Sequence, residues 1–193
     1  MAVDDLMLAY VVNDGPDPAG AEYDATSDPA GWTFLRNEGD AASDSSIGVF
    51  WKIAVTADLS TSNYTFTSTG SFDRSCGILR ISGVDTTTPI GVSGTFTSTT
   101  GTTDDIPGIT TINANSLVIG FAAGDGADTS PFTVSGTGWS EVAEIVSAST
   151  GNDGNSAVWA SKEMATAGAT GDPTITMNSS DGIGSFMISI NPQ

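Results

Sequence analysis

The chain has 193 residues, 38% of them apolar, and its 23 acidic and 5 basic residues give a net charge of −18. Such an acidic surface repels phosphate, so neither direct binding to nucleic acid nor binding to anionic membranes is expected. The single cysteine excludes an intrachain disulfide, and the absence of histidine excludes Ser-His-Asp catalysis, Cys-His catalysis and His-ligated zinc.

The first predicted element is an apolar segment that recurs in the middle of the chain. Residues 5–15 (DLMLAYVVNDG) match residues 116–126 (SLVIGFAAGDG) without a gap, at a shift of 126 − 15 = 111 positions. Each copy is an apolar run that ends in a polar, glycine-containing turn, which is typical of a buried strand. Because both faces of residues 6–12 are apolar, we expect a central strand that is covered on both sides.

Further strands are expected along the first half, and helices are not, because Gly, Ser, Thr, Asp and Pro recur every few residues. The predicted strands are residues 31–35, 47–54, 64–67 and 76–84. In residues 64–67 the aromatic side chains should point inward and the threonines outward. Residues 85–115 are less regular: 91–97 and 109–112 are candidate short strands, and the threonine-rich run 97–103 is predicted to be a loop.

The second half repeats the pattern of the first. Residues 138–142 match 31–35 at a shift of 107, and residues 174–176 and 186–190 match 65–67 and 77–81 at a shift of 109. Residues 157–159 match 48–51 with a register uncertain by one or two. The sequence therefore predicts an internal duplication, with halves at roughly 5–84 and 116–191.

Four strands with one apolar face are not stable alone, so the two halves must cover each other. They can pack face to face or intercalate their strands, and intercalation is favoured because no clear linker separates them. We therefore predict one all-β domain over residues 1–193. Its expected architecture is an antiparallel β-sandwich, jelly-roll-like in the broad sense, with about 8–10 strands.

The four tryptophans form two pairs in the repeat, Trp32 with Trp139 and Trp51 with Trp159. Exposed tryptophans could form stacking platforms for sugar rings, whereas buried ones would belong to the core. A packing position should obey the internal duplication, and a ligand site need not. The repeat therefore favours core packing.

The acidic residues suggest no specific chemistry. Acidic turns occur at residues 14–17, 104–105, 125–128 and 152–154, but calcium needs about six to eight converging oxygens, and turn formation explains these residues better. The glutamates are Glu22, Glu38, Glu141, Glu144 and Glu163, and no pair stands out as a glycosidase pair. We predict no catalytic, cofactor-binding or metal-binding residue, and hence no enzyme.

Two residues of the strand at 76–84 are of separate interest. Cys76 is expected to be a small buried apolar side chain. Arg80 lies between Leu79 and Ile81 and is expected either to pair with an acid or to contact a neighbouring subunit; the sequence leaves both open.

The order of segments resembles a known group of proteins. The segments are 5–10 (DLMLAY), 29–33 (PAGWT), 51–54 (WKIA), 64–67 (YTFT), 78–85 (ILRISGVD) and 115–119 (NSLVI). Together they resemble the β-sandwich, jelly-roll-like domains of virion structural proteins of tailed bacteriophages, and of some bacterial surface proteins. The resemblance covers nearly the whole chain, and the ordered set carries it, not any one motif. It implies a non-catalytic structural or surface role and transfers no catalytic residue.

This resemblance leads to a functional expectation. The favoured role is a capsid decoration (cement) protein on the outer surface of the phage head, made in the host cytoplasm without processing. Its partners would be the major capsid protein or other virion proteins, and it would form a homo-oligomer such as a trimer. No cofactor, nucleic acid or membrane is expected. The alternative is a receptor- or carbohydrate-binding module of a tail fibre, head fibre or cell-surface appendage.

Overall fold

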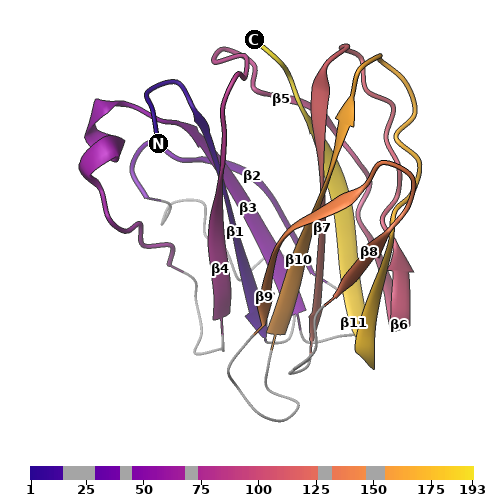
Figure 1. Ribbon diagram of the computed structural model, residues 1–193. Helices are drawn as coiled ribbons and strands as arrows, with labels where there is room; N and C mark the ends of the chain where they lie inside the picture. The colour runs from indigo at the N-terminus through magenta and orange to yellow at the C-terminus, as the bar shows by residue number, and fades with distance from the viewer. Residues whose placement is uncertain (15–28, 40–44, 68–73, 126–131, 147–154) are drawn as a thin grey trace.

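A computed structural model describes residues 1–14, 29–39, 45–67, 74–125, 132–146 and 155–193. These residues form antiparallel strands and one short 3₁₀ helix (Figure 1). The strands are β1 (Leu6–Asp14), β2 (Thr33–Gly39), β3 (Ser45–Ile53), β4 (Arg74–Ile81), β5 (Ile90–Ser93), β6 (Thr97–Asp105), β7 (Ser116–Asp125), β8 (Thr133–Ser135), β9 (Ser140–Val146), β10 (Asn155–Met164) and β11 (Thr174–Ile190). The predicted all-β, sandwich-like fold is confirmed, with eleven strands in place of the expected 8–10.

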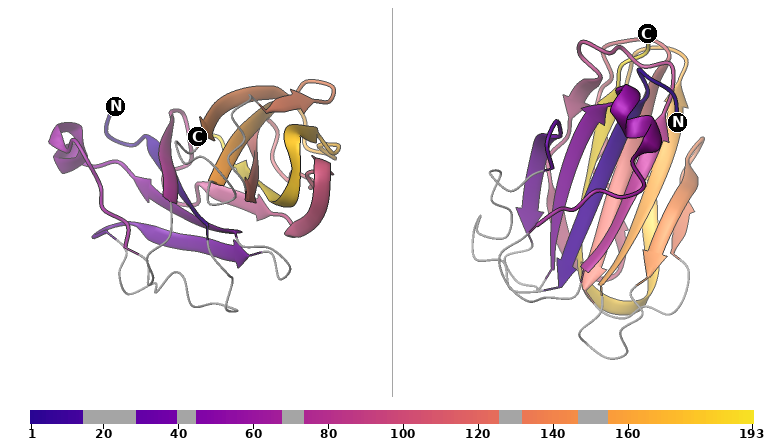
Figure 2. Two further views of the ribbon diagram at one scale, coloured as in Figure 1. Left: turned by 90° about the horizontal axis from the view of Figure 1, so that it is seen from below. Right: turned by 90° about the vertical axis from the view of Figure 1, so that its left-hand side faces the viewer.

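Each half of the chain forms its own sheet. The first sheet has the order β2-β3-β1-β4, and the second has the order β5-β11-β7-β10-β9, with β6 and β8 also paired to β11. The second sheet curls into a nearly closed barrel, seen end-on in the left view of Figure 2. The halves therefore pack face to face. The favoured intercalation of strands was wrong, because none of the described strands pairs with a strand of the other half.

The strand pairing confirms the internal duplication. β2, β3, β1 and β4 correspond to β9, β10, β7 and β11, which are neighbours in the same order. The residue register agrees as well: Leu8 lies opposite Leu79, and its counterpart Ile119 lies opposite Ile188. Leu8 and Ile119 thus occupy equivalent core positions. The shift from β4 to β11 is 188 − 79 = 109, as the sequence predicts.

Two irregular features are also repeated. β2 and β9 each carry a β-bulge, at Leu35 and at Val142, which have no partner in the register of the neighbouring strand. Before each strand, Gly31 and Gly138 have positive φ angles of 85° and 77°, which glycine adopts without strain. A deviation at the same place in both halves is a property of the repeated unit.

The core has three layers. Between the sheets, apolar side chains of β1, β3, β7, β10 and β11 form the central cluster, in which the Phe121 ring stacks on Phe186 with centroids 4.9 Å apart. A second cluster fills the barrel, and a third lies on the outer face of the first sheet. β1 contributes Leu8 to the central cluster and Ala9 to the outer one, so it is covered on both sides as predicted.

The outer face of the first sheet is covered by the segment that follows β3. It begins with the 3₁₀ helix η2 (Thr56–Ser60), and Tyr64 and Phe66 pack onto the outer cluster. In residues 64–67 the aromatic side chains point inward and the threonines outward, as predicted. The prediction of a strand there was wrong, because these residues form no strand. Within the described part of the chain, no helix is long and apolar enough to cross a membrane.

The covering segment is fastened by a buried carboxylate. Asp58 is 2% exposed and accepts hydrogen bonds from Lys52 Nζ (2.7 Å), the Tyr64 hydroxyl (2.6 Å) and the Val55 N–H (2.8 Å). Burial alone raises the pKa of Asp58, but these three donors outweigh it and hold the pKa at about 2. Asp58 thus joins β3 to both ends of the covering segment.

The region between the halves differs from the expectation. The threonine-rich run 97–103 is not a loop; it belongs to β6, which pairs with β11. Threonine is β-branched and favours strands, and the neighbouring β11 decides the outcome. In residues 109–112 only an isolated bridge forms, between Thr110 and Ala169.

Candidate functional site

The tryptophans belong to the cores, as predicted. Trp32, Trp139 and Trp159 are at most 8% exposed, and Trp51 is half-buried against the central cluster. The pairing of Trp51 with Trp159 was wrong by two positions: Tyr10 lies opposite Val49, and its counterpart Phe121 lies opposite Trp159. None of the four forms an exposed stacking platform.

The described acids do not form a metal-binding cluster. No group of three or more Cys, Asp or Glu side chains in the described residues could hold a metal ion. Glu38 pairs with Arg36, whereas Glu141, Glu144 and Glu163 lie on β9 and β10. The turns at 14–17, 125–128 and 152–154, as well as Glu22, lie wholly or largely outside the described residues.

One carboxyl group of the acidic turn at 104–105 is buried in the barrel wall. Asp104 is 8% exposed and accepts a short hydrogen bond from the Ser185 hydroxyl. Burial raises the pKa of Asp104, and the Ser185 donor offsets this only in part. The side chain borders a cavity of about 340 Å³ together with Thr97, Thr99 and Thr103. Asp105 lines the cavity as well, and its Oδ1 accepts a hydrogen bond from the Thr174 hydroxyl at 2.6 Å. Two carboxylates that are each bonded within the fold, among threonines, fall short of the six to eight converging oxygens of a calcium site.

The structure corrects the prediction for Cys76 and identifies the partner of Arg80; both residues lie on β4. Cys76 is exposed, not buried, because it lies on the outer face of β4, which the covering segment does not reach. On the same face, Arg80 Nε lies 2.5 Å from Asp5 Oδ2. Of the two possibilities for Arg80, the pair with an acid is therefore the one that the structure contains. The Ala2 N–H, and then Arg80, lower the pKa of Asp5 against the effect of burial.

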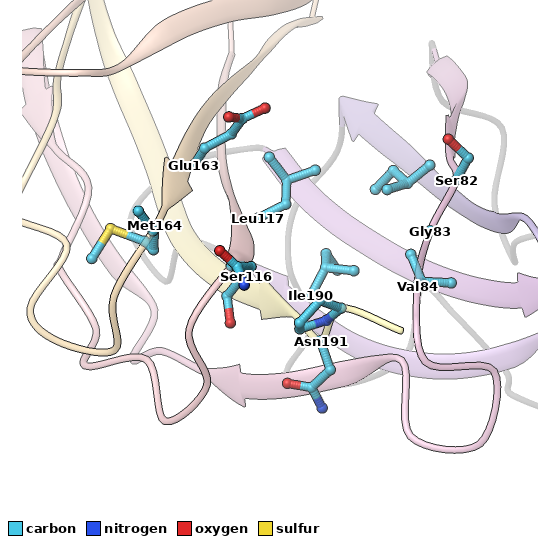
Figure 3. A pocket seen from close by; sticks show the side chains of 13 residues that line it. Ser82, Gly83, Val84, Ser116, Leu117, Glu163, Met164, Ile190 and Asn191 are labelled. Carbon is cyan, nitrogen blue, oxygen red and sulfur yellow. The ribbon is translucent and has the colours of Figure 1, made fainter.

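A cavity of about 490 Å³ lies at one end of the seam between the two sheets (Figure 3). It is lined by the end of β4 and the residues after it on one side, and by residues of β7, β10 and β11 on the other. Val84 and Ile190 supply an apolar floor, while Ser82, Asn115 and Glu163 supply exposed polar groups. Its size is within the range of small-ligand sites.

Two of the polar side chains that line this cavity, Ser116 and Asn191, are buried. Its buried polar groups already have partners: Asn191 Nδ2 donates to the Thr88 carbonyl at 2.7 Å, and Ser116 Oγ donates to the Asn113 carbonyl at 2.9 Å. Glu163 is its one carboxylate, whereas glycoside hydrolysis commonly requires two. The sequence did not predict this cavity, because its lining comes from four separate segments.

The two long sides of the sandwich differ. On one side, Arg36 of β2 bridges to the second sheet, donating to the Gly94 carbonyl at 2.7 Å and lying 4.4 Å from the centre of the Phe186 ring. On the other side, β4 and β9 lie next to each other, separated by a cavity of about 90 Å³. Ile78, which lines this cavity, is 45% exposed.

Comparison with known proteins found no matching family model, curated protein or solved structure.

Proposed function

We propose that the protein is a non-catalytic structural component of a tailed-bacteriophage virion, most specifically a capsid decoration (cement) protein on the outer surface of the head. The virion assignment rests on the resemblance of the ordered sequence segments. The structural observation that supports a non-catalytic role is the use of the buried acids. Asp5, Asp58 and Asp104 are each engaged within the fold, by Arg80, by Lys52 and by Ser185.

The acidic surface is compatible with this role. With a net charge of −18, copies held close together on a shell repel one another and stay separately folded and soluble. A decoration protein stabilises a shell by adding contacts across capsomers, and such contacts raise the stability of the shell by mass action. A two-sheet sandwich suits such a role, because binding to a shell requires no conformational change of the protein.

The test is to locate the chain on particles. Immunogold electron microscopy with antibodies against the recombinant chain should label the heads of phage particles produced by the host that encodes it. Purified chain added to expanded, undecorated capsids should co-sediment with them and raise their melting temperature. Particles that lack the chain, or label on the tail alone, would contradict the decoration role.

A second candidate function is glycan or receptor binding, and the 490 Å³ cavity favours it because its apolar floor and polar rim suit a small polar ligand. In a glycan array, a ligand of this cavity should bind the wild-type chain and lose affinity in Glu163→Gln. The matched control is Glu141→Gln, which changes an exposed glutamate outside the cavity. Equal binding by both variants would exclude the cavity as the site.

A further inference from the structure

The outer edge of β4 is unpaired among the described residues, whereas the equivalent edge in the second half is paired. β4 corresponds to the second part of β11 at a shift of 109, and both are neighbours of the repeated strand, β1 or β7. On its other edge β11 pairs with β5 and β6, for example Ile188 with Ser93 and Ser185 with Thr97. Within the described chain, β4 pairs with β1 alone. The duplication therefore marks the edge of β4 as a place for a further strand.

β4 carries two arginines but lacks two other usual protections of an edge strand, a bulge and a proline. The opposite edge of the same sheet, β2, has a bulge at Leu35 and is fastened to the second sheet by Arg36. β4 pairs with β1 in a continuous register without a bulge, and it contains no proline. An edge that is regular and carries exposed apolar side chains is a template for pairing with another strand. Ile78, 45% exposed, is such a side chain.

The charge of β4 contrasts with that of the whole chain. Arg74–Ile81 contains no acid and two of the chain's five basic residues, although the net charge is −18. Both arginines are held over β1: Arg74 Nε donates to Asn13 Oδ1 at 3.0 Å, and Arg80 pairs with Asp5. Because β4 contains no acid, a second copy of this acidic chain meets no carboxylate of the strand itself when it pairs there.

We propose that β4 pairs antiparallel with β4 of a second copy about a two-fold axis, so that the two four-stranded sheets join into one of 4 + 4 = 8 strands. A register with Ile78 opposite Ile78 places Cys76 opposite Arg80 of the partner subunit and brings no two arginines directly opposite each other. A register centred on Gly77 would place Arg74 opposite Arg80, which is destabilising. The contact makes a dimer, not the trimer considered from the sequence. It does not depend on the virion role, since a receptor-binding module could dimerise in the same way.

The oligomeric state of the full chain tests this proposal. Sedimentation equilibrium should show a dimer for the wild type and a dissociation constant raised by about tenfold or more in Ile78→Lys, because two lysine ammonium groups would lie directly opposite each other at the axis. The matched control is Ile112→Lys, which changes an isoleucine that is 70% exposed on the loop before β7 and should leave the dimer intact. Circular dichroism verifies that each variant is folded.

The register is tested by cross-linking. In the double variant Cys76→Ser/Ile78→Cys the two introduced thiols of a dimer lie opposite each other, so mild oxidation should give a disulfide-linked dimer. Wild-type Cys76, opposite Arg80 of the partner subunit, should cross-link much less. A wild-type monomer, an Ile78→Lys dimer of unchanged affinity, or a double variant that dimerises without forming the disulfide would each overturn the proposal. Binding of β4 only to a foreign acidic peptide would overturn it as well.

Discussion

The hydroxyl groups of Tyr10 and Tyr64 lie in opposite environments. Tyr10 is 2% exposed, its ring packs on Trp159 at a centroid distance of 4.4 Å, and its hydroxyl has no hydrogen-bond partner among the described residues. Burial raises the pKa of Tyr10 well above its usual value. Tyr64, in contrast, donates to Asp58 at 2.6 Å. A buried polar group without a partner costs stability, whereas a hydrogen bond to a carboxylate adds to it.

The same substitution at these two tyrosines should therefore have opposite effects. Tyr10→Phe should leave the free energy of unfolding unchanged or raise it by up to about 1 kcal/mol, whereas Tyr64→Phe should lower it by about 1.5–3 kcal/mol. Urea denaturation, monitored by tryptophan fluorescence, measures the free energy of unfolding of both variants. A clear loss of stability in Tyr10→Phe would show that its hydroxyl has a partner after all.

Asp104 gives a residue-scale prediction that depends on pH. Because burial raises the pKa of this carboxyl group in the folded state, the fold favours the protonated form, and stability is lost as pH rises through the folded pKa. Asp104→Asn stays neutral and can still bond Ser185. The variant should be more stable than the wild type at pH 7, and the difference should vanish near pH 3. Thermal unfolding at both pH values measures it; an equal difference at both would refute the assignment.

At the scale of elements, the covering segment after β3 depends on one ion pair. Lys52 Nζ and Asp58 Oδ1 are 2.7 Å apart, and both side chains are largely buried, with 12% and 3% exposed. Removing one partner of such a pair leaves the other charge uncompensated. Without Asp58 the segment would lose its attachment over Phe50 and Trp32, which form the outer cluster.

Asp58→Ala should therefore lower the free energy of unfolding at pH 7 by about 3–5 kcal/mol. Since the pKa of Asp58 is lowered to about 2 in the folded state, its contribution is complete above the unfolded pKa of about 4 and is lost as pH falls toward 2. The difference between wild type and variant should shrink over that range. Urea titrations at several pH values measure this, and a difference that is constant with pH would contradict the role of the carboxylate.

The elements also show what the sequence can and cannot predict. The two covered faces of β1 followed from its apolar residues, and the 109-residue shift placed β11 on β4 correctly, because burial requires the same pattern in both halves. β6 was missed because a threonine run carries no alternation until a neighbour defines its faces. The exposure of Cys76 was missed because an apolar strand does not reveal whether its sheet is covered there. The 490 Å³ cavity was missed because residues of four separate segments line it, and no single segment has a sequence pattern that indicates a cavity.

At the scale of the whole molecule, the net charge of −18 opposes compaction. Raising NaCl from about 0.01 M to about 0.15 M shortens the Debye length from about 30 Å to about 8 Å, which screens this repulsion. The melting temperature at pH 7 should therefore rise with NaCl. Near the sequence pI of 4.1 the repulsion is small, so the same salt should have little effect there. Differential scanning calorimetry at both pH values measures this, and an equal rise at both would point to a cause other than charge screening.

The separation of the two halves into two sheets has a consequence for synthesis. The first sheet, β1 to β4, is complete once residue 81 has left the ribosome, whereas the strands that cover its inner face end at residue 190. At typical elongation rates, the inner face with Leu6, Leu8 and Val12 stays uncovered for roughly 5–20 s. During that time the nascent chain presents an apolar sheet to its surroundings. Chaperone contact and aggregation are therefore concentrated on the N-terminal half, before the second sheet closes over it.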